Sequence, residues 1–594
     1  MINRFIRNFL NGQHIIHKIR QVQTVRRTFL HQCIKNECPP AAVLSLGARA
    51  ESSSSSSNRP SHRSKLLNDY HNKRAANLQL NDLGNHVLEF ALDPRGSRFI
   101  KQKLECASPT ETAHLVDALR GQVLTLALHK SATHVIRAAL ESVDKASLIE
   151  IINELSAQVL LLSLHKYGAW VIQSLLDHCT EQQKRHVMEQ LHGNVLSLAM
   201  DQYGNHVIQH LIEHGRPEDR EPIVRSLQEN VLTLVTDHYG SFVIQHLIEH
   251  GRPEDRERIV RSLQGGIMKY AQDKFGSLVI RKCLICGTPE QKKALFDNVC
   301  GGGPKTLQNA RQLMADEFGT FVIQKFFEYG TDEQKAQLVD ALRGHVVTLA
   351  LHKSGSHVIR TALKSVDKAS QIEITNEILA QVLPLSLHEY GTCVIQSLLD
   401  HCMEQQKRPV LEQLHGNVLS LVMDQYGSFV IKHVLEHGRP EDRERIVRSL
   451  QQNVLTLVTD KYGSFVIQHL IEHGLPEDRE RIVRSLQGDI LKNTYLHSFC
   501  SVIEKCMVFG TTKQRNALID RVCADNGSGN PPLLEMMKYP IGNKVVLKML
   551  NVADPARREK MMLAIKTAPI KSTPNRSSKS LTHTVQAQQR GGAE

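Results

Sequence analysis

Apolar and polar residues follow each other along most of the chain with the period of an amphipathic α-helix. In residues 180–215, four apolar residues share one side of a helix: Val207, Ile208, Leu211 and Ile212. The opposite side of that helix carries three polar residues: Asn205, His206 and Gln209. The pattern predicts a helix that packs on its apolar side and leaves its polar side uncovered.

Local residue types set the limits of the helices in this segment. Thr180 with Gln183 fits a capping box, so a first helix is expected to run to about Leu191. A second helical stretch is expected from Val195 to His214, and a glycine follows it as a helix stop. In later copies of the segment, a proline suits the first helical turn.

The same segment recurs thirteen times, marked by the phrase Tyr-Gly-x-x-Val-Ile. The glycine position is held by Gly96, Ala132, Gly168, Gly204, Gly240, Gly276, Gly319, Gly355, Gly391, Gly427, Gly463, Phe499 and Gly542. The steps are 36 residues, except for two steps of 43 that contain turn-forming insertions at 301–304 and 526–531. One unit cannot bury its apolar side alone, so the repeats must stack around a continuous core. The sequence therefore predicts an all-α solenoid of about thirteen repeats, with the Val-Ile pairs and the preceding Tyr or Phe in the core.

A longer match shows that a block of these repeats is duplicated. The heptapeptide LVDALRG occupies residues 115–121 and again 338–344, an offset of 223 residues. The same offset aligns Cys283 with Cys506.

The net charge of +12 lies at the two ends of the chain. Residues 1–63 hold ten Lys/Arg and two acidic residues, and residues 565–594 hold five Lys/Arg and one acidic residue, so residues 64–564 are neutral. We expect a basic, Ser-rich disordered segment at 1–63, the repeat array at 64–566 and a disordered basic tail at 567–594. The acid-free first 36 residues also resemble an amphipathic transit peptide. A cytoplasmic location is expected, with the mitochondrion as the alternative.

The sequence gives little support for a membrane span, a metal site, a phosphate loop or an enzyme. No apolar run reaches 18 residues, which argues against a membrane span, and the scattered cysteines suggest a reducing compartment. The recurring histidines at 210, 246, 433 and 469, and at 214, 250, 437 and 473, favour packing and capping over metal binding. The lone Cys283–Cys286 pair and the glycines at 301–303 do not meet the requirements of a metal site or a phosphate loop. We expect no enzyme, no cofactor, no metal and no small-molecule substrate.

The repeats resemble Pumilio (PUF) repeats. Segments 93–105 (DPRGSRFIKQKLE), 202–218 (QYGNHVIQHLIEHGRPE) and 318–330 (FGTFVIQKFFEYG) carry the resemblance, which covers most of the chain. It implies a right-handed superhelix that binds single-stranded RNA, one base per repeat. Two side chains four residues apart contact the base edge, and a third, just after the first, stacks between bases.

Transferred to this chain, the resemblance names candidate contact residues. The first edge position falls on Ser97, Thr133, Asn205, Ser241, Ser277, Thr320, Ser356, Thr392, Ser428, Ser464, Cys500 and Asn543. The second falls on Arg137, Gln173, Gln209, Gln245, Arg281, Gln324, Arg360, Gln396, Gln468 and Glu504. The stacking position falls on Arg98, His134, Trp170, His206, Phe242, Phe321, His357, Phe429 and Phe465.

The same resemblance suggests base preferences for some repeats. Asn205 with Gln209 resembles a uracil-reading pair, and Cys500 with Glu504 a guanine-reading pair. Ser241 with Gln245 and Ser464 with Gln468 resemble adenine-reading pairs. Ser277 with Arg281 and Ser356 with Arg360 resemble cytosine-reading pairs, or else these arginines contact phosphate. Ala169, Leu547 and the poor stacking residues Leu278, Cys393 and Ser501 depart from the family pattern, as does the number of repeats, since eight are typical.

Three functions follow as alternatives. The first is sequence-preferring binding to mRNA 3′ untranslated regions for repression or decay, with regulatory proteins as candidate partners on the outer face. The second is a ribosome-biogenesis role with little sequence preference. The third is a protein-binding solenoid that has lost RNA affinity.

Overall fold

The computed structural model describes residues 63–75, 77–300, 304–493, 495–524 and 531–567. Within these residues the regular elements are helices, and no strand occurs. The prediction of an all-α repeat solenoid is therefore confirmed. Residues 1–62 and 568–594 of the predicted tails lie outside the described residues, as do residues 301–303 and 526–530 of the predicted insertions at 301–304 and 526–531.

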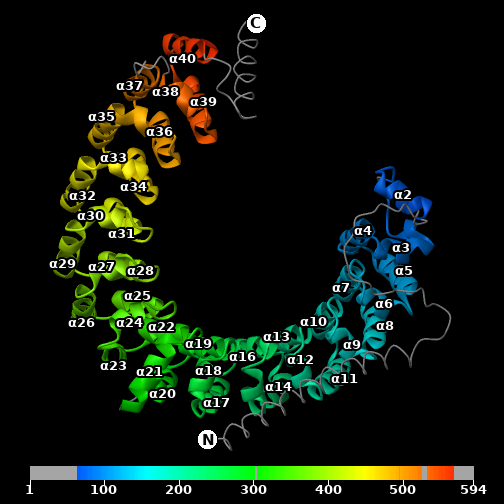
Figure 1. The fold of residues 1–594 in the computed structure, drawn as a ribbon. Coiled ribbons are helices and arrows are strands. Elements are labelled where there is room, and N and C mark those ends of the chain that lie inside the picture. The colour runs from blue at the N-terminus through cyan, green and yellow to red at the C-terminus, as the bar shows by residue number, and fades with distance from the viewer. Residues whose placement is uncertain (1–62, 76, 301–303, 494, 525–530, 568–594) are drawn as a thin grey trace, which may run out of the picture. The chain divides into compact units, whose positions relative to one another are not determined.

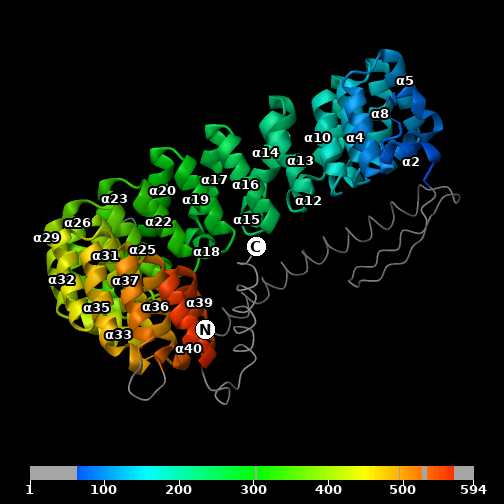
Figure 2. The same ribbon diagram turned by 90° about the horizontal axis from the view of Figure 1, so that it is seen from above.

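The chain divides between Leu295 and Phe296 into two compact units. In each unit the helices stack in consecutive repeats, and each repeat contributes an inner helix and an outer helix (Figure 1). Figure 2 shows the same stacks turned by 90°. The inner helices of neighbouring repeats pack on each other and form what we call the inner row.

The inner row of the first unit holds six helices: α4 (Pro94–Leu104), α7 (Thr133–Ser142), α10 (Gly168–His178), α13 (Gly204–His214), α16 (His238–His250) and α19 (Gly276–Cys286). The inner row of the second unit consists of α22 (Gly319–Tyr329), α25 (Gly355–Ser365), α28 (Gly391–His401), α31 (Gly427–His437), α34 (Lys461–His473), α36 (His497–Phe509) and α39 (Pro540–Val552).

The outer helices pack behind the inner row. They are α5 (Pro109–Leu119), α8 (Lys145–Ser156), α11 (Glu181–His192), α14 (Pro217–Glu229), α17 (Pro253–Gln264), α20 (Pro289–Cys300), α23 (Asp332–Leu342), α26 (Lys368–Leu379), α29 (Glu404–His415), α32 (Pro440–Gln452), α35 (Pro476–Asn493), α37 (Thr512–Val522) and α40 (Pro555–Thr567). The array starts with α2 (Lys65–His71) and a 3₁₀ segment, η1 (Asn81–His86).

Most repeats also contain a short helix ahead of the inner helix. These helices are α3 (Val87–Leu92), α6 (Val123–Ala127), α9 (Val159–Ser163), α12 (Val195–Ala199), α15 (Val231–Leu234), α18 (Ile267–Ala271), α24 (Val346–Ala350), α27 (Val382–Ser386), α30 (Val418–Val422), α33 (Val454–Thr459) and α38 (Pro532–Met536). In the seventh repeat a longer helix, α21 (Pro304–Ala315), takes this place.

The predicted second helical stretch from Val195 to His214 is wrong in one respect, because it is two helices, α12 and α13. The break is held by the Asp201 carboxylate, which accepts hydrogen bonds from the amides of Tyr203 (2.8 Å) and Gly204 (3.0 Å). Such a side chain caps a new helix and stops the old one from continuing. The capping box at Thr180 is confirmed, and Gly215 follows α13 with a φ of −67°, so it does not act through a left-handed conformation.

The predicted apolar side of the inner helices forms the core. Val207, Ile208, Leu211 and Ile212 are each at most 1% exposed, and the other Val-Ile pairs are buried as well. Burying one such side chain is worth about 1.5–3 kcal/mol. The aromatic residue before the glycine is only half-buried in repeats such as those of Tyr203 and Phe275, so its predicted place in the core is wrong. It precedes the inner helix and therefore lies at the edge of the packed layer.

Among the described residues, no helix combines the length and apolar character needed to cross a membrane.

Candidate RNA-binding interface

A cap geometry that recurs along the repeats fixes where each inner helix begins. In repeats such as the fourth, an aspartate oxygen accepts from the two amides that open the helix, as Asp201 does. In four repeats a histidine takes this position, and its Nδ1 accepts instead; these are His129, His165, His352 and His388. The residue after the glycine therefore falls in the first turn of the inner helix.

This placement buries the first edge positions, against the prediction that Asn205 lies on an uncovered polar side. None of the twelve predicted residues is more than 6% exposed. The Asn205 amide donates to the backbone oxygens of Asp201 (2.8 Å) and Gln202 (2.9 Å). The hydroxyl of Thr320 donates to the backbone oxygen of Ser354 in the next repeat (3.0 Å). The preceding loop and the next repeat thus cover these small side chains.

The hydrogen bonds that the first edge positions already make determine which donors and acceptors they keep for a base. The hydroxyl of Ser464 donates to the backbone oxygen of Lys461 (2.9 Å), and that of Ser241 to His238 (3.0 Å). A hydroxyl has one proton and two lone pairs, so these residues are left as acceptors. Burial raises the pKa of the Cys500 thiol to about 11, so this residue stays a neutral thiol at pH 7.

The second edge positions lie one turn further along the inner helix and are less covered. Gln209, Gln245 and Gln324 are half-buried. The amide of Gln209 donates to the Asn205 side-chain oxygen (2.8 Å), which brings the two members of the predicted uracil-reading pair into direct contact. The amide of Gln245 donates to the backbone oxygen of Ser241 (3.2 Å). A primary amide keeps a second N–H and its oxygen after such a bond.

The predicted stacking residues are the exposed part of the inner row. All nine are exposed, including five aromatic rings between 42% and 51% exposed: Trp170, Phe242, Phe321, Phe429 and Phe465. The departures from the family pattern, Leu278, Cys393 and Ser501, are only half-buried and present small or aliphatic surfaces. Large rings held in water repeat after repeat mark an interaction surface rather than a core. Flat aromatic faces at this place suit stacking with nucleobases.

Two histidines in the stacking positions are kept neutral. Partial desolvation by the surrounding protein, together with the charges of Arg137, Lys101 and Arg98, lowers the pKa of His134. Partial desolvation and the charge of Arg360 lower the pKa of His357. Both imidazoles therefore present an uncharged ring at neutral pH.

The cations at the second edge position have different surroundings. They include Lys432, four residues after Ser428. The Arg137 guanidinium lies 5.9 Å from the centre of the Trp170 ring and donates from Nε to Ser174 (3.0 Å). The Lys432 ammonium lies 4.7 Å from the centre of the Phe429 ring. These two cations support stacking rings electrostatically. Arg281 is half-buried and Arg360 is exposed.

Glu504, the predicted guanine-reading carboxylate, already has a partner. The Lys544 ammonium of the next repeat lies 3.1 Å from Glu504 Oε1. Lys544 is 66% exposed in its side chain, so this ion pair is open to solvent and can exchange for another partner.

A pocket between the eleventh and twelfth repeats joins predicted residues with others that sequence reasoning missed. Ser464, Phe465 and Gln468 line it, together with Thr459, Lys461, His497, Ser498 and Ser501. The Gln468 amide nitrogen is buried there and has no hydrogen-bond partner. His497 contacts Ser501, one turn later on α36 (3.4 Å from Nδ1 to Oγ). It therefore offers a ring where the stacking residue is a serine, and its spacing of four residues from Ser501 could have revealed it.

Comparison with protein families gives two matches. Nine segments, which together span half of the chain, match a Pumilio-family RNA binding repeat: residues 86–120, 122–156, 158–192, 194–227, 230–263, 267–300, 453–486, 500–523 and 533–566. Residues 308–435 and 372–465 match a NOP9-like PUF repeat domain.

Curated relatives match over short stretches. Pumilio homolog 2 of Xenopus laevis is 62% identical over 52 residues, which is 9% of this chain and 4% of that protein. Maternal protein pumilio of Drosophila melanogaster is 59% identical over 49 residues, 8% of this chain and 3% of that protein.

Solved structures are similar over longer stretches. The Puf3 RNA binding domain bound to a Cox17 RNA 3′ UTR recognition sequence is 26% identical, with a TM-score of 0.46, and the match covers 55% of this chain and 96% of that domain. PUF-8 in complex with PBE-RNA is 26% identical, with a TM-score of 0.48, over 55% of this chain and 94% of that chain.

Proposed function

Because the chain belongs to the Pumilio family of RNA-binding repeat proteins, we propose that its inner row binds single-stranded RNA with a preference for sequence. One observation carries the proposal. In the fourth, fifth and eleventh repeats, an exposed flat ring lies beside a small buried acceptor and a half-buried amide. In the fourth repeat these are His206, Asn205 and Gln209. The ring suits the face of a base and the polar pair suits its edge.

We propose further that the RNA is mRNA, bound in its 3′ untranslated region, and that binding represses translation or promotes decay. The family resemblance supports this extension. Regulatory proteins are proposed to contact the outer helices. The proposed location is the cytoplasm, with the mitochondrion as the alternative, and fusing residues 1–50 to a fluorescent reporter decides between them.

The test of base reading is selection of bound RNA from a random pool. The wild-type chain is compared with Gln209→Ala and with the double variant Asn205→Ala/Gln209→Ala. We expect both variants to lose the preference at one base position by about 1–3 kcal/mol and to keep it at the others. The single variant is needed because Asn205 also bonds to two backbone oxygens, so its loss alone can disturb the cap of α13.

A matched control sits on the outer helix of the next repeat. Glu221 and Arg225 form an exposed ion pair on α14, with side chains 65% and 66% exposed. The variant Glu221→Ala/Arg225→Ala should select the same RNA as the wild type. If Gln209→Ala also selects an unchanged sequence, the base-reading assignment is wrong, whereas an even loss of affinity for all RNAs points to phosphate contacts.

A second function, ribosome biogenesis with little sequence preference, has one observation in its favour. Residues 308–435 and 372–465 match a NOP9-like PUF repeat domain, and of these residues only 453–465 also match the general repeat. One of the poor stacking residues, Cys393, lies in that part of the chain. A selection that enriches no sequence, while the chain still binds RNA tightly, would favour this function.

A further inference from the structure

Pairs of histidines recur near the C-terminal ends of inner helices, at positions that the RNA proposal does not use. In each pair the first histidine faces a carboxylate of the preceding inner helix: His210 faces Asp177, His246 faces Glu213, His433 faces Asp400 and His469 faces Glu436. The ring of the second histidine lies beside the first in each pair; these residues are His214, His250, His437 and His473. At the same place in other repeats, Lys282 pairs with Glu249 and Lys505 with Glu472. The general role of this position is thus a contact between a basic side chain and a carboxylate of the neighbouring inner helix, in keeping with the predicted packing role.

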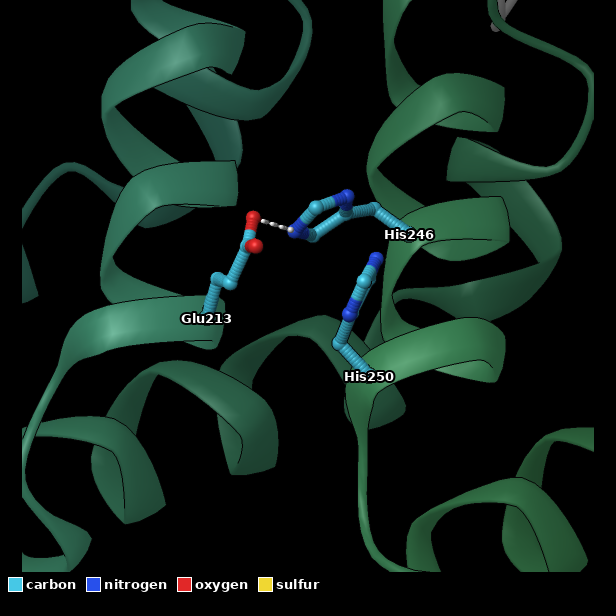
Figure 3. A group of neighbouring side chains, drawn as sticks. All are labelled: Glu213, His246 and His250. Carbon is cyan, nitrogen blue, oxygen red and sulfur yellow. Dashed lines mark ion pairs between the residues drawn. The ribbon is translucent and has the colours of Figure 1, made fainter.

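One of the four pairs differs in its geometry. Figure 3 shows Glu213 on α13 facing the rings of His246 and His250 on α16. One ligand atom from each of the three residues lies within 4.8 Å of the other two, and no other group of three in the described part of the chain meets that condition. The two ring centres are 4.3 Å apart, against 4.8 Å in each of the other three pairs.

The hydrogen bonding of His246 Nε2 also differs from that in two of the other pairs. Its Nε2 is buried without a hydrogen-bond partner, although Glu213 Oε2 lies 3.4 Å away. In the first and third pairs, by contrast, Nε2 of His210 and His433 makes a hydrogen bond to an aspartate at 2.9 Å and 2.8 Å. A buried polar atom without a partner is costly, so its presence points to a ligand.

We propose that Glu213, His246 and His250 form a binding site for a divalent transition-metal ion, with Zn²⁺ as the best fit. Two imidazoles and one carboxylate are a known zinc ligand set, with water in the fourth position. Mg²⁺ and Ca²⁺ prefer oxygen ligands alone. Glu213 and His250 are 42% and 37% exposed, so an ion and its water can reach the site.

The bound ion would join the fourth and fifth repeats through α13 and α16. A further carboxylate, Glu249, lies with Oε2 3.9 Å from His250 Nε2 and is held by Lys282 Nζ at 2.6 Å. The site lies on the two helices that carry Asn205 with Gln209 and Ser241 with Gln245. It therefore fixes the spacing of two adjacent base-reading pairs.

The experiment is titration of the full-length chain, without RNA, by Zn²⁺ in calorimetry and by Co²⁺ in visible absorption. The variants are His250→Gln and Glu213→Gln, both at exposed side chains, so folding should be preserved. The matched control is His437→Gln. In the pair of His433 and His437, Nε2 of His433 already makes a hydrogen bond to Asp400. We expect the dissociation constant to rise at least tenfold in the first two variants and to stay at the wild-type value in the control.

Co²⁺ should give the absorption of a four-coordinate site in the wild type and the control, and this absorption should be lost in His250→Gln. Excess Mg²⁺ should leave Zn²⁺ binding unchanged. Equal zinc affinity in the wild type, His250→Gln and Glu213→Gln would overturn the proposal. So would an equal loss in His437→Gln, because binding would then not depend on this trio.

Discussion

At the scale of single residues, the inner row exposes large aromatic rings to water. Trp170, the only tryptophan of the chain, is 45% exposed and lies beside the Arg137 guanidinium. A ring kept in water contributes little to folding, so its placement calls for a binding role.

The first prediction concerns this ring. Trp170→Ala should weaken binding of the selected RNA by about 1–3 kcal/mol, the value of one base stacked on an aromatic side chain. Thermal unfolding should change little, because nearly half of the ring is already exposed. Fluorescence anisotropy with labelled RNA measures the loss, and quenching of the single tryptophan by RNA in the wild type reports the stacking directly.

Leu232→Ala is the matched control for Trp170→Ala. Leu232 is an apolar side chain of similar exposure, 48%, but it lies on the short helix α15. The Leu232→Ala variant should bind RNA like the wild type. If the tryptophan variant binds as tightly as this control, the ring does not stack on RNA.

The first edge positions show what the sequence could and could not predict at this scale. Their identity follows from the repeat spacing and from the family pattern. Their burial does not, because a helical wheel contains one helix only. The backbone oxygen that covers Thr320 belongs to Ser354, 34 residues away, and the one that covers Thr392 belongs to Tyr426. Such neighbours exist only once the repeats are stacked.

At the scale of helices, the caps decide where an inner helix begins and hence which residues are exposed on the inner row. Aspartate and histidine fill the same cap position but respond differently to acid. An imidazole can accept from backbone amides only while its Nδ1 is unprotonated. His165 accepts from the amides of Tyr167 (3.2 Å) and Gly168 (3.3 Å), and burial lowers its pKa.

The second prediction follows from that lowered pKa. The folded state favours neutral His165, so its contribution to stability is complete above the unfolded pKa of about 6.5 and falls as the pH drops through the lower folded value. His165→Asp should keep its cap at pH 5, since a carboxylate is still charged there. Between pH 7 and pH 5, this variant should lose about 0.5–2 kcal/mol less stability than the wild type.

Denaturant unfolding at the two pH values measures the difference, and hydrogen exchange of the Gly168 amide locates it. The reciprocal variant Asp201→His should become more sensitive to acid than the wild type. An identical response of His165→Asp and the wild type would show that the cap does not depend on the protonation of His165.

The helix limits were predictable where residues close together in the sequence determine them, and not where a tertiary contact takes part. Thr180 and Gln183 mark the start of α11 without reference to the rest of the fold. The break between α12 and α13 needs both the Asp201 cap and a glycine, because a Cβ on Gly204 would lie 2.8 Å from the backbone oxygen of Leu198. That close approach is a tertiary contact, so the sequence pattern alone suggested one continuous helix.

At the scale of the whole molecule, the repeat period predicts the solenoid because each repeat packs mainly on its neighbours. It does not predict the division between Leu295 and Phe296, since the repeat pattern continues on both sides. The net charge of the chain lies at its two ends. Residues 64–564 are neutral, and residues 1–63 carry a net charge of +8. Long-range attraction to RNA and base reading should therefore belong to different parts of the chain.

The last prediction separates these two parts. Deleting residues 1–63 should lower affinity for every RNA by a similar factor, because the basic segment can contact phosphates but no defined base. It should also make the dependence of log Kd on log salt shallower, by about 0.7 for each phosphate that the segment neutralises. The ratio of affinities for the selected RNA and a one-base variant should stay the same, since Gln209 and its counterparts remain in place. Anisotropy titrations at several salt concentrations measure both quantities. A ratio that falls to one after the deletion would place sequence preference in the basic segment and not in the inner row, whatever the stacking residues contribute.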